Sequence, residues 1–175
     1  MGASPTVRTF MEIKLRRFEL SDLEKVMKIE KISFPESPAY PKSYFQRYYQ
    51  KYPQGFIAAE NKGNVIGYTI GQAKNGVPAK RVAEIISLAV KPEFRQKSVG
   101  WALTEFLVNH FRDKNVKEIS LHVRTKNRAA ISFFQNLGFK ILKTIKNYYR
   151  NGDDAYLMKL SLHLNPRSAS PRSGI

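Results

Sequence analysis

One segment constrains the fold of this chain more than any other: an apolar run that leads through a basic loop into an amphipathic stretch. Residues 83–90 are apolar enough for a strand buried on both faces, which predicts a central place in a sheet. Pro92 breaks that strand, and a helix is expected from about residue 98 to residue 114. A buried strand followed by such a helix indicates a mixed α/β domain.

The rest of the chain alternates between strands and helices in the same way. Further strands are expected near Ile13 and at 56–59, 65–70, 118–123, 140–149 and 154–160, and further helices at 43–52, at 127–137 and after a capping box at Ser21–Glu24. A tight Asn151-Gly152 turn is expected to join the last two strands. The order of the elements predicts one mixed α/β sheet with helices on both faces.

The length of 175 residues predicts a single domain, which we place at residues 11–160. Residues 1–10 are expected to be a flexible N-terminal extension. Residues 161–175 are rich in serine, proline and arginine, so a disordered C-terminal tail is expected there.

The composition excludes several kinds of chemistry. The chain has no cysteine, and its three histidines show no metal-ligand spacing, so we expect no disulfide, no cysteine nucleophile and no metal. No apolar run approaches 18 residues, and no secretory signal pattern is present. We therefore expect a cytoplasmic protein without a membrane partner.

The formal net charge of +16 favours polyanionic partners. RNA, DNA, a ribosome surface and a multiply phosphorylated cofactor would all be attracted by such a field. A basic proteome or a solvated face would produce the same excess, so the charge alone selects no partner.

The loop of residues 95–100 has the chemistry of an anion site. The first amides of a helix are unpaired and the helix dipole adds positive potential, so a pyrophosphate would fit there. Gly100 permits a close backbone approach, while Arg95 and Lys97 add charge. The loop does not match a Walker motif, and taken alone it could equally be a structural turn.

Together with a later block, this loop resembles the motifs of the GNAT N-acetyltransferase superfamily. Residues 95–100 resemble the acetyl-CoA motif R/Q-x-x-G-x-G/A, and residues 127–139 resemble the N-x-x-A-x-x-F/Y-Y-x-x-x-G-F block. Residues 121–124 and 148–158 are similar to the catalytic subunits of protein N-terminal (Nα) acetyltransferases of the archaeal, eukaryotic and bacterial ribosomal-protein-alanine types. The resemblance spans about residues 11–160.

The resemblance implies both a fold and a reaction. The GNAT fold would have about seven mostly antiparallel strands, helices on both faces and a splayed central strand pair, with acetyl-CoA in the gap. The enzyme would transfer acetyl to the α-amine of a protein N-terminus by direct attack on the thioester within a ternary complex. A monomer is expected, and the basic surface would permit ribosome association.

The resemblance also implies cofactor contacts along the end of the central strand, the basic loop and the starts of two helices. The residues are Leu88, Ala89, Val90, Arg95, Gln96, Lys97, Ser98, Val99, Gly100, Trp101, Asn127 and Phe134. Two of them depart from the family pattern. Ser98 replaces the first glycine of the motif and would crowd the pyrophosphate slightly. Phe134 replaces the tyrosine that protonates the departing thiolate in many members. We expect activity without that acid, because a thiol of pKa about 8.5 leaves readily.

The catalytic residues implied by the resemblance are Glu84, His122 and Tyr148. Glu84 occupies the base position of the family, and His122 faces it from the neighbouring strand, so the two could relay a proton. At pH 7 a peptide α-amine costs about 1 kcal/mol to neutralise and a lysine amine about 4 to 5 kcal/mol, so an N-terminus needs only a modest base. Alternatively, Glu84 is a solvated strand-end charge and His122 a satisfied core histidine.

Substrate contacts are implied for two segments of the chain. They comprise Phe34, Pro35, Glu36 and Tyr40 after the first helix, and Tyr148 and Tyr149 near the last turn. Phenols suit backbone recognition because they are large and stiff and carry one polar tip. The alternative for the tyrosine pair is cross-strand packing. Because a strand alternates faces, only one of the two could enter a slot unless the chain bends.

Two other functions are compatible with the same sequence. A lysine or polyamine N-acetyltransferase would share the cofactor motifs, although the tyrosine pair favours a peptide over a small amine. An RNA- or ribosome-binding module on an acetyltransferase scaffold would make use of the positive charge.

Overall fold

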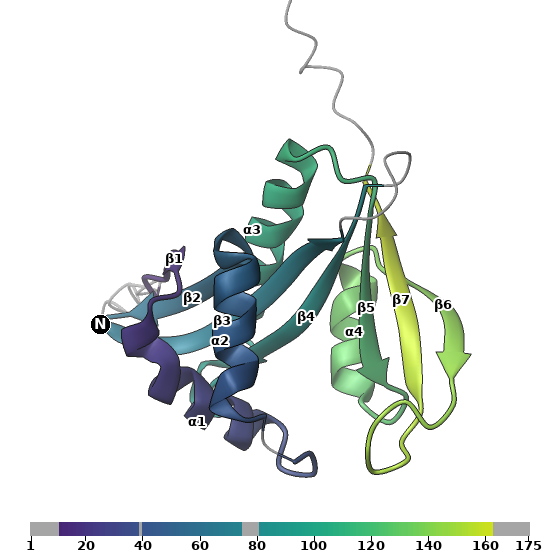
Figure 1. Cartoon of the computed structure of the whole chain (residues 1–175), viewed down its shortest axis with the longest axis horizontal. Coiled ribbons are helices and arrows are strands. Elements are labelled where there is room, and N and C mark those ends of the chain that lie inside the picture. The colour runs from purple at the N-terminus through teal and green to yellow at the C-terminus, as the bar shows by residue number, and fades with distance from the viewer. Residues whose placement is uncertain (1–10, 39, 75–80, 163–175) are drawn as a thin grey trace, which may run out of the picture.

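The computed structural model describes residues 11–38, 40–74 and 81–162, and its strands form one seven-stranded sheet in the order β1-β2-β3-β4-β5-β7-β6 (Figure 1). The strands are β1 Lys14–Arg17, β2 Phe56–Asn61, β3 Asn64–Lys74, β4 Val82–Val90, β5 Glu118–Arg124, β6 Lys140–Ile145 and β7 Ala155–Ser161. The helices are α1 Leu23–Ser33, α2 Lys42–Lys51, α3 Val99–Asp113 and α4 Arg128–Asn136. Neighbouring strands are antiparallel except β4 and β5, which are parallel, so the predicted mixed sheet is confirmed.

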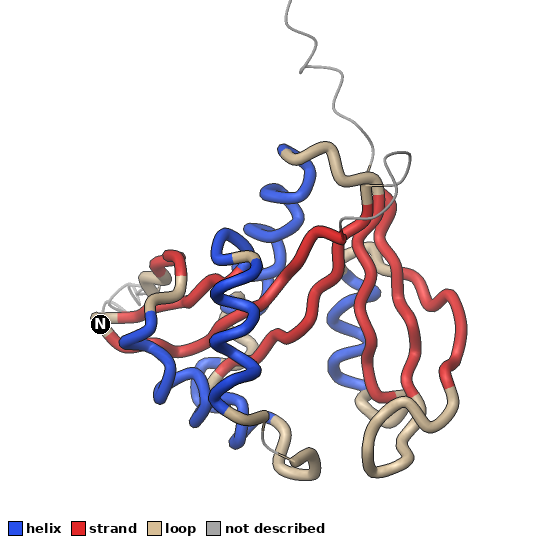
Figure 2. The backbone as a smooth tube through the Cα atoms, viewed as in Figure 1, coloured by secondary structure: helices blue, strands red, loops and turns tan. Residues whose placement is uncertain are grey.

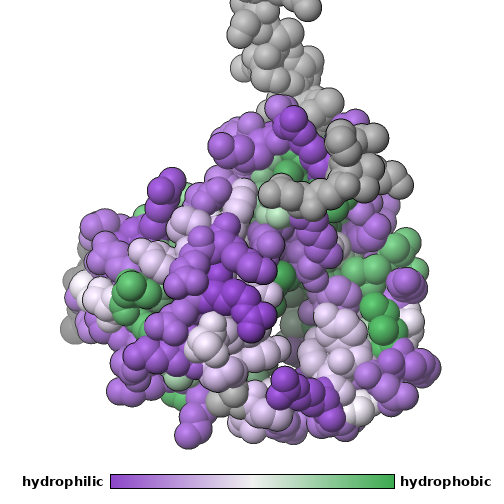
Figure 3. Space-filling model, viewed as in Figure 1, coloured by the Kyte–Doolittle hydropathy of each residue, from purple (hydrophilic) through white to green (hydrophobic). Residues whose placement is uncertain are grey.

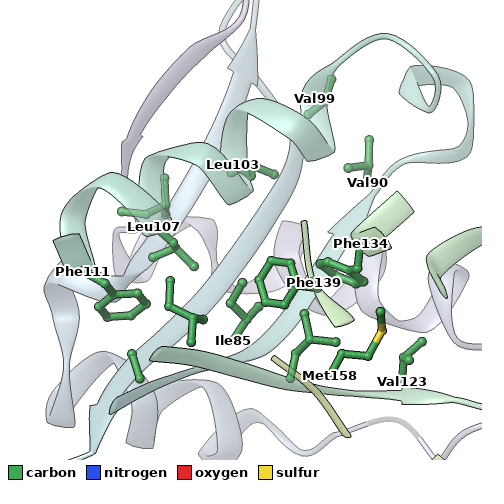
Figure 4. Packing of buried hydrophobic residues seen from close by; sticks show 14 of the residues in the cluster. Ile85, Val90, Val99, Leu103, Leu107, Phe111, Val123, Phe134, Phe139 and Met158 are labelled. Carbon is green, nitrogen blue, oxygen red and sulfur yellow. The ribbon is translucent and has the colours of Figure 1, made fainter. Parts of the chain in front are cut away.

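Helices cover both faces of the sheet, as predicted (Figure 2). α3 and α4 cover one face, where Leu103, Leu107 and Phe134 pack in one buried cluster with Ile85 and Met158 (Figure 4). On the other face, α1 and α2 cover β2, β3 and β4. Their contacts are formed by Val26, Ile29 and Phe45 with Ala58, Tyr68 and Ala89. On this second face no described helix lies over β5, β7 and β6 (Figure 1).

The central strands β4 and β5 separate along their length. They pair only between Val82–Ile85 and Glu118–Leu121, whereas β4 remains paired with β3 as far as Val90. A bulge at Ile86 marks the point of separation, because Ser87 pairs with Ile70 but Ile85 pairs with Gly71. The splayed pair is therefore confirmed. From Ile86 to Val90 the backbone edge of β4 has no strand partner among the described residues.

The expected capping box at Ser21–Glu24 is wrong. A 3-10 turn, Leu20–Asp22, precedes α1, and Asp22 rather than Ser21 is the N-cap. The buried Asp22 carboxylate accepts the Glu19 N–H at 3.0 Å and lies 2.6 Å from the Arg16 guanidinium. Because this ion pair fixes Asp22 in place, the start of the helix follows the ion pair instead of the exposed serine hydroxyl.

The expected tight turn between the last two strands is also wrong. β6 ends at Ile145 and β7 begins at Ala155, so residues 146–154 form a longer loop. The Asp154 carboxylate accepts the Asn147 N–H at 2.9 Å, and the Gly152 N–H donates to the Tyr149 carbonyl at 2.8 Å. These bonds replace the ladder that would have extended the hairpin. Tyr148 and Tyr149 therefore lie on a loop and are not bound by strand alternation.

At the C-terminal end, β7 runs through Ser161 and Leu162 is buried, while residues 1–10 and 163–175 lie outside the described residues. The loop at 75–80 lies outside them as well. Within the described ranges no helix is long and apolar enough to cross a bilayer, and no group of three metal-ligating side chains is present.

Candidate active site

A cleft of about 220 Å³ lies where β4 and β5 separate, and Figure 3 shows the surface hollowed between the two halves of the sheet. The cleft is lined by side chains of α1 and its following loop, β4, β5, α4 and the β6–β7 loop. Seven of the predicted site residues line it: Phe34, Tyr40, Leu88, His122, Asn127, Phe134 and Tyr149. The fold thus brings together predicted cofactor, catalytic and substrate residues from distant parts of the chain.

The basic loop adopts a conformation suited to an anion. Gln96 and Ser98 have positive φ angles of 57° and 65°, and alternating left-handed residues of this kind turn successive amides toward one point. α3 begins at Val99, directly after the loop, and contributes its first unpaired amides. The left-handed conformation of Ser98 explains why the family motif has glycine here. At Gly100, a Cβ atom would lie 3.3 Å from the Phe133 ring, so this glycine permits close packing of α3 and α4.

Two of the predicted cofactor residues, Arg95 and Lys97, contact other parts of the chain. The Arg95 guanidinium donates to the Val90 carbonyl at 2.9 Å and to the Ser33 hydroxyl at 3.2 Å, so it braces the loop against β4 and α1. The Lys97 ammonium lies 5.7 Å from the centroid of the Phe94 ring. Trp101 is 46% exposed on α3 and does not line the cleft. Ala89 and Val90 are buried in the two cores, so only their backbone groups remain for a ligand.

Asn127 and Phe134 form the wall of the cleft on the α4 side. The Asn127 carboxamide oxygen accepts the Ala130 N–H at 3.1 Å, which confirms the predicted N-cap and leaves the amide nitrogen to donate to a ligand. Phe134 is 7% exposed and packs edge-on against Phe139. This wall is therefore apolar except for one amide.

Glu84 and His122 form a hydrogen-bonded pair across the parallel strands. The Glu84 Oε1 atom lies 3.1 Å from His122 Nδ1, and Glu84 Oε2 lies 2.7 Å from Lys74 Nζ. Burial acts to raise the pKa of Glu84, but the hydrogen bonds from His122 and Lys74 outweigh it and hold the pKa below its usual value. An ionised carboxylate only accepts, so His122 Nδ1 donates this hydrogen bond, and Nε2 is the ring nitrogen that is not engaged by Glu84.

Tyr148 lies flat against the imidazole. Its ring stacks on His122 with centroids 4.5 Å apart and an interplanar angle of 13°, and it meets Tyr149 edge-on at 5.0 Å. Burial raises the pKa of the Tyr148 phenol, and the Glu84 charge raises it further. Burial also raises the pKa of Tyr149, to about 12. Both phenols therefore stay protonated near neutral pH and can donate hydrogen bonds.

Arg124 joins the two loops that flank the cleft. Its guanidinium donates to the Ser37 hydroxyl at 2.6 Å on one side and pairs with Asp153 at 2.6 Å on the other, and it lies 3.9 Å from the centroid of the Tyr149 ring. The sequence predicts no role for Arg124, although it lies in the segment of residues 121–124 that resembles the family. Its only sequence signal is a cation at the end of a buried strand.

The loop after α1 differs in detail from the expectation. Phe34 and Tyr40 line the cleft, whereas Pro35 and Glu36 are exposed and do not. Ser37, for which the sequence predicts no role, lines the cleft instead and accepts a hydrogen bond from Arg124. The predicted contact by Glu36 therefore has no support from this geometry.

A buried carboxyl group that sequence analysis also missed lies behind the bulge in β4. Glu30 of α1 is 4% exposed, accepts a hydrogen bond from the Tyr68 hydroxyl and lines the cleft. The Tyr68 hydroxyl lies 3.0 Å from Ser87 Oγ, so the cluster joins α1, β3 and β4 at the bulge. Burial raises the pKa of Glu30. A glutamate on the apolar stripe of α1 was the available sequence signal.

Comparison with known proteins places this site in a family. Residues 23–139 match the model of the acetyltransferase (GNAT) family. The N-alpha-acetyltransferase of Sulfolobus acidocaldarius is 33% identical over 157 residues, which cover 85% of this chain and 92% of that protein. Among solved structures, Naa20 of Chaetomium thermophilum in complex with a bisubstrate analogue matches with a TM-score of 0.78 and 30% identity, over 85% of this chain and 86% of that one. Ard1 of Thermoplasma volcanium matches with a TM-score of 0.79 and 28% identity, over 86% and 98% of the two chains.

The chain belongs to the GNAT family and is an N-acetyltransferase that uses acetyl-CoA. Three features at or beside the cleft fit this cofactor. The edge of β4 offers unpaired backbone groups, and Phe133 and Phe134 supply an apolar wall. The left-handed loop before α3, whose residues do not line the cleft itself, offers amides for a diphosphate.

Proposed function

We propose that this enzyme acetylates the α-amine of protein or peptide N-termini. The observation that carries the proposal is the hydrogen-bonded Glu84–His122 pair with Tyr148 stacked on the imidazole at the cleft. An α-ammonium has a pKa of about 7.8 and a lysine ammonium a pKa of about 10.4, so proton transfer from lysine to the same base costs about 3.5 kcal/mol more. A side-chain base of moderate strength therefore suits N-termini better than lysine side chains.

The side chains have separate roles in this proposal. His122 Nε2 takes the proton of the attacking ammonium, directly or through one water, while Glu84 holds the ring in the required tautomer. Tyr148 and Tyr149 donate to the first backbone carbonyls of the substrate. Arg124 keeps the two flanking loops at a fixed distance.

The cofactor side of the cleft positions the reacting carbonyl. Bound acetyl-CoA supplies an activated acetyl group as a thioester. The unpaired β4 backbone near Leu88 orients the donor, the amides of residues 96–100 hold its diphosphate, and Asn127 donates from α4. The amine nitrogen forms the new C–N bond as the C–S bond breaks, within a ternary complex.

The leaving group needs no acid from residue 134. Phe134 cannot donate a proton, and a thiol of pKa about 8.5 leaves readily as a thiolate near neutral pH. Solvent, or the protonated phenol of Tyr148, then returns the proton.

Intact-mass measurement with acetyl-CoA and matched peptides tests the proposal. Peptides with a free N-terminus should gain one acetyl group whether or not they contain lysine, and N-terminally blocked peptides should gain none. Acetylation of a blocked, lysine-containing peptide would instead assign the enzyme to lysine side chains. RNA binding without any acetyl transfer would favour the binding module. Ribosome association, a monomeric state and a cytoplasmic location stay predictions.

A further inference from the structure

A second, open groove begins at the catalytic histidine. It has a volume of about 660 Å³ and lies on the face of β5, β7 and β6 that no described helix covers. His122 lines both this groove and the cleft between β4 and β5. The opposite face of the same strands is buried under α4, where Val123 and Met158 pack.

Strand register places cations of the groove at definable distances from His122. His122 pairs with Leu157 and Leu157 pairs with Lys143, so these three residues form one row across β5, β7 and β6. Strands lie about 4.8 Å apart, which places the Cα atom of Lys143 about 10 Å from that of His122. Lys117 directly precedes β5, about 16 Å from His122 at about 3.3 Å per residue.

Positive charge predominates in the groove. Four lysines line it, Lys74, Lys117, Lys143 and Lys159, together with the carboxylate of Glu118. Glu118 pairs with Lys159 at 2.6 Å, and Glu84 beside the groove pairs with Lys74 at 2.7 Å. Lys117 and Lys143 are exposed and form no ion pair with any described residue. The groove therefore has two cations available for an anionic ligand.

We propose that this groove binds acidic side chains of the substrate, a few residues after its N-terminus. The inference rests on the proposed function, because a chain whose α-amine lies at His122 must continue away from that residue. An extended peptide advances about 3.3 Å per residue, so a chain that crosses the sheet reaches Lys143 with its third or fourth residue, whereas a chain that follows β5 toward its start reaches Lys117 with its fifth or sixth. Each course brings one free lysine within reach of an acidic side chain. A nucleic-acid backbone is disfavoured, because Glu118 lines the groove and no arginine lines it among the residues that the structure describes.

Lysine-free peptides that differ only at positions 3–6 test this inference. These positions carry glutamate, glutamine or arginine in three peptides that share their first two residues. One exposed ion pair should lower the KM of the glutamate peptide about 2- to 5-fold relative to the glutamine peptide at low salt, with kcat unchanged. The arginine peptide should have the highest KM, and 0.5 M salt should remove the differences, since the Debye length at about 1 M salt is only about 3 Å.

Charge reversal in the groove supplies the variant. Lys117→Glu/Lys143→Glu should abolish or reverse the preference for glutamate, whereas Lys28→Glu/Lys51→Glu, which changes two exposed lysines of α1 and α2, should preserve it. Equal KM values for the glutamate and glutamine peptides in the wild type would overturn the inference. Survival of the preference in Lys117→Glu/Lys143→Glu would overturn it too.

Anisotropy of the same peptides, labelled at their C-termini, measures binding without turnover. If no free N-terminus is acetylated, the proposed function fails, while anisotropy still reports whether the groove selects acidic chains. A labelled single-stranded RNA provides the last comparison. Loss of RNA affinity in Lys117→Glu/Lys143→Glu with an unchanged peptide preference would assign the groove to RNA and refute the acidic-chain proposal.

Discussion

If Glu84 acts only through His122, removing both side chains should lower kcat/KM little more than removing the histidine alone. The geometry predicts this dependence, because Glu84 Oε1 bonds to the Nδ1 atom and leaves Nε2 as the only basic nitrogen of the ring. The variants are His122→Ala, Glu84→Gln and the double substitution. Lys74→Gln is the matched control, since it removes the other partner of Glu84 and leaves the contact with the histidine intact.

The magnitudes follow from the two roles. Loss of a general base costs about 10²- to 10⁴-fold, so His122→Ala should lower kcat/KM about 1,000-fold. A hydrogen bond to a charged group is worth about 1.5 to 3 kcal/mol, so Glu84→Gln should lower kcat/KM about 10- to 100-fold. In the His122→Ala background the same change should cost less than about 2-fold. Lys74→Gln should change kcat/KM less than about 3-fold, because Lys74 is half exposed.

The assay is release of free thiol from acetyl-CoA with a peptide that has a free N-terminus, at constant pH. Thermal unfolding of every variant checks that each one folds. Multiplicative losses in the double variant would show that Glu84 contacts the substrate independently of the histidine. A loss in Glu84→Gln larger than that in His122→Ala would make the carboxylate the base, and the assignment of Nε2 would then fail.

Four further perturbations test other parts of the site. Ser98→Gly removes the side chain that is expected to crowd the pyrophosphate, so acetyl-CoA should bind more tightly by calorimetry, and an unchanged affinity would argue against a diphosphate at this loop. Arg124→Gln releases both flanking loops, so the KM for peptide should rise about 10-fold while that for acetyl-CoA changes less than 2-fold; equal changes would refute a role confined to the substrate side. Glu30 has a raised pKa, so the folded protein keeps a proton that the unfolded chain loses above about pH 4.5. The free energy of unfolding should therefore fall as pH rises through that raised pKa. Urea unfolding at several pH values should show this slope in the wild type and a smaller one in Glu30→Gln. Phe134→Tyr introduces the tyrosine that many family members have at this position as a proton donor, and kcat should rise less than about 3-fold. A larger gain would show that protonation of the thiolate limits the rate.

The order of the elements was predictable because each one has a local signal. Apolar periodicity located β4 and α3, and Asn127 marked the start of α4 through its own side chain. The facing of Glu84 and His122 was also predictable once the family motif orients the strands, because β4 and β5 are neighbours and Glu84 is in register with Ser120, which lies on the same face of β5 as His122.

Contacts between distant loops could not be predicted in this way. Arg124 and Ser37 are 87 positions apart and meet only after β5 and the loop after α1 have been assembled. The loop of residues 146–154 depends on Asp154 and Asn147, whose mutual bond competes with strand pairing over a few residues. Propensity favoured the strand there, and the side-chain to backbone hydrogen bond outweighs it.

The bulge at Ile86 changes which face of the sheet the side chains of β4 point to. Before it, Glu84 points to the face with His122 and Lys74, while Ile85 points to the core under α3. A regular strand would then place residues 88 and 90 on the same face as Glu84, because strand side chains alternate with a period of two. The inserted residue reverses that alternation, so Leu88 and Val90 pack against the α3 core. The strand thus presents a carboxylate to the face of His122, where the proposed function places the peptide, and, a few residues later, an unpaired backbone edge to the gap beside β5, where it places the cofactor.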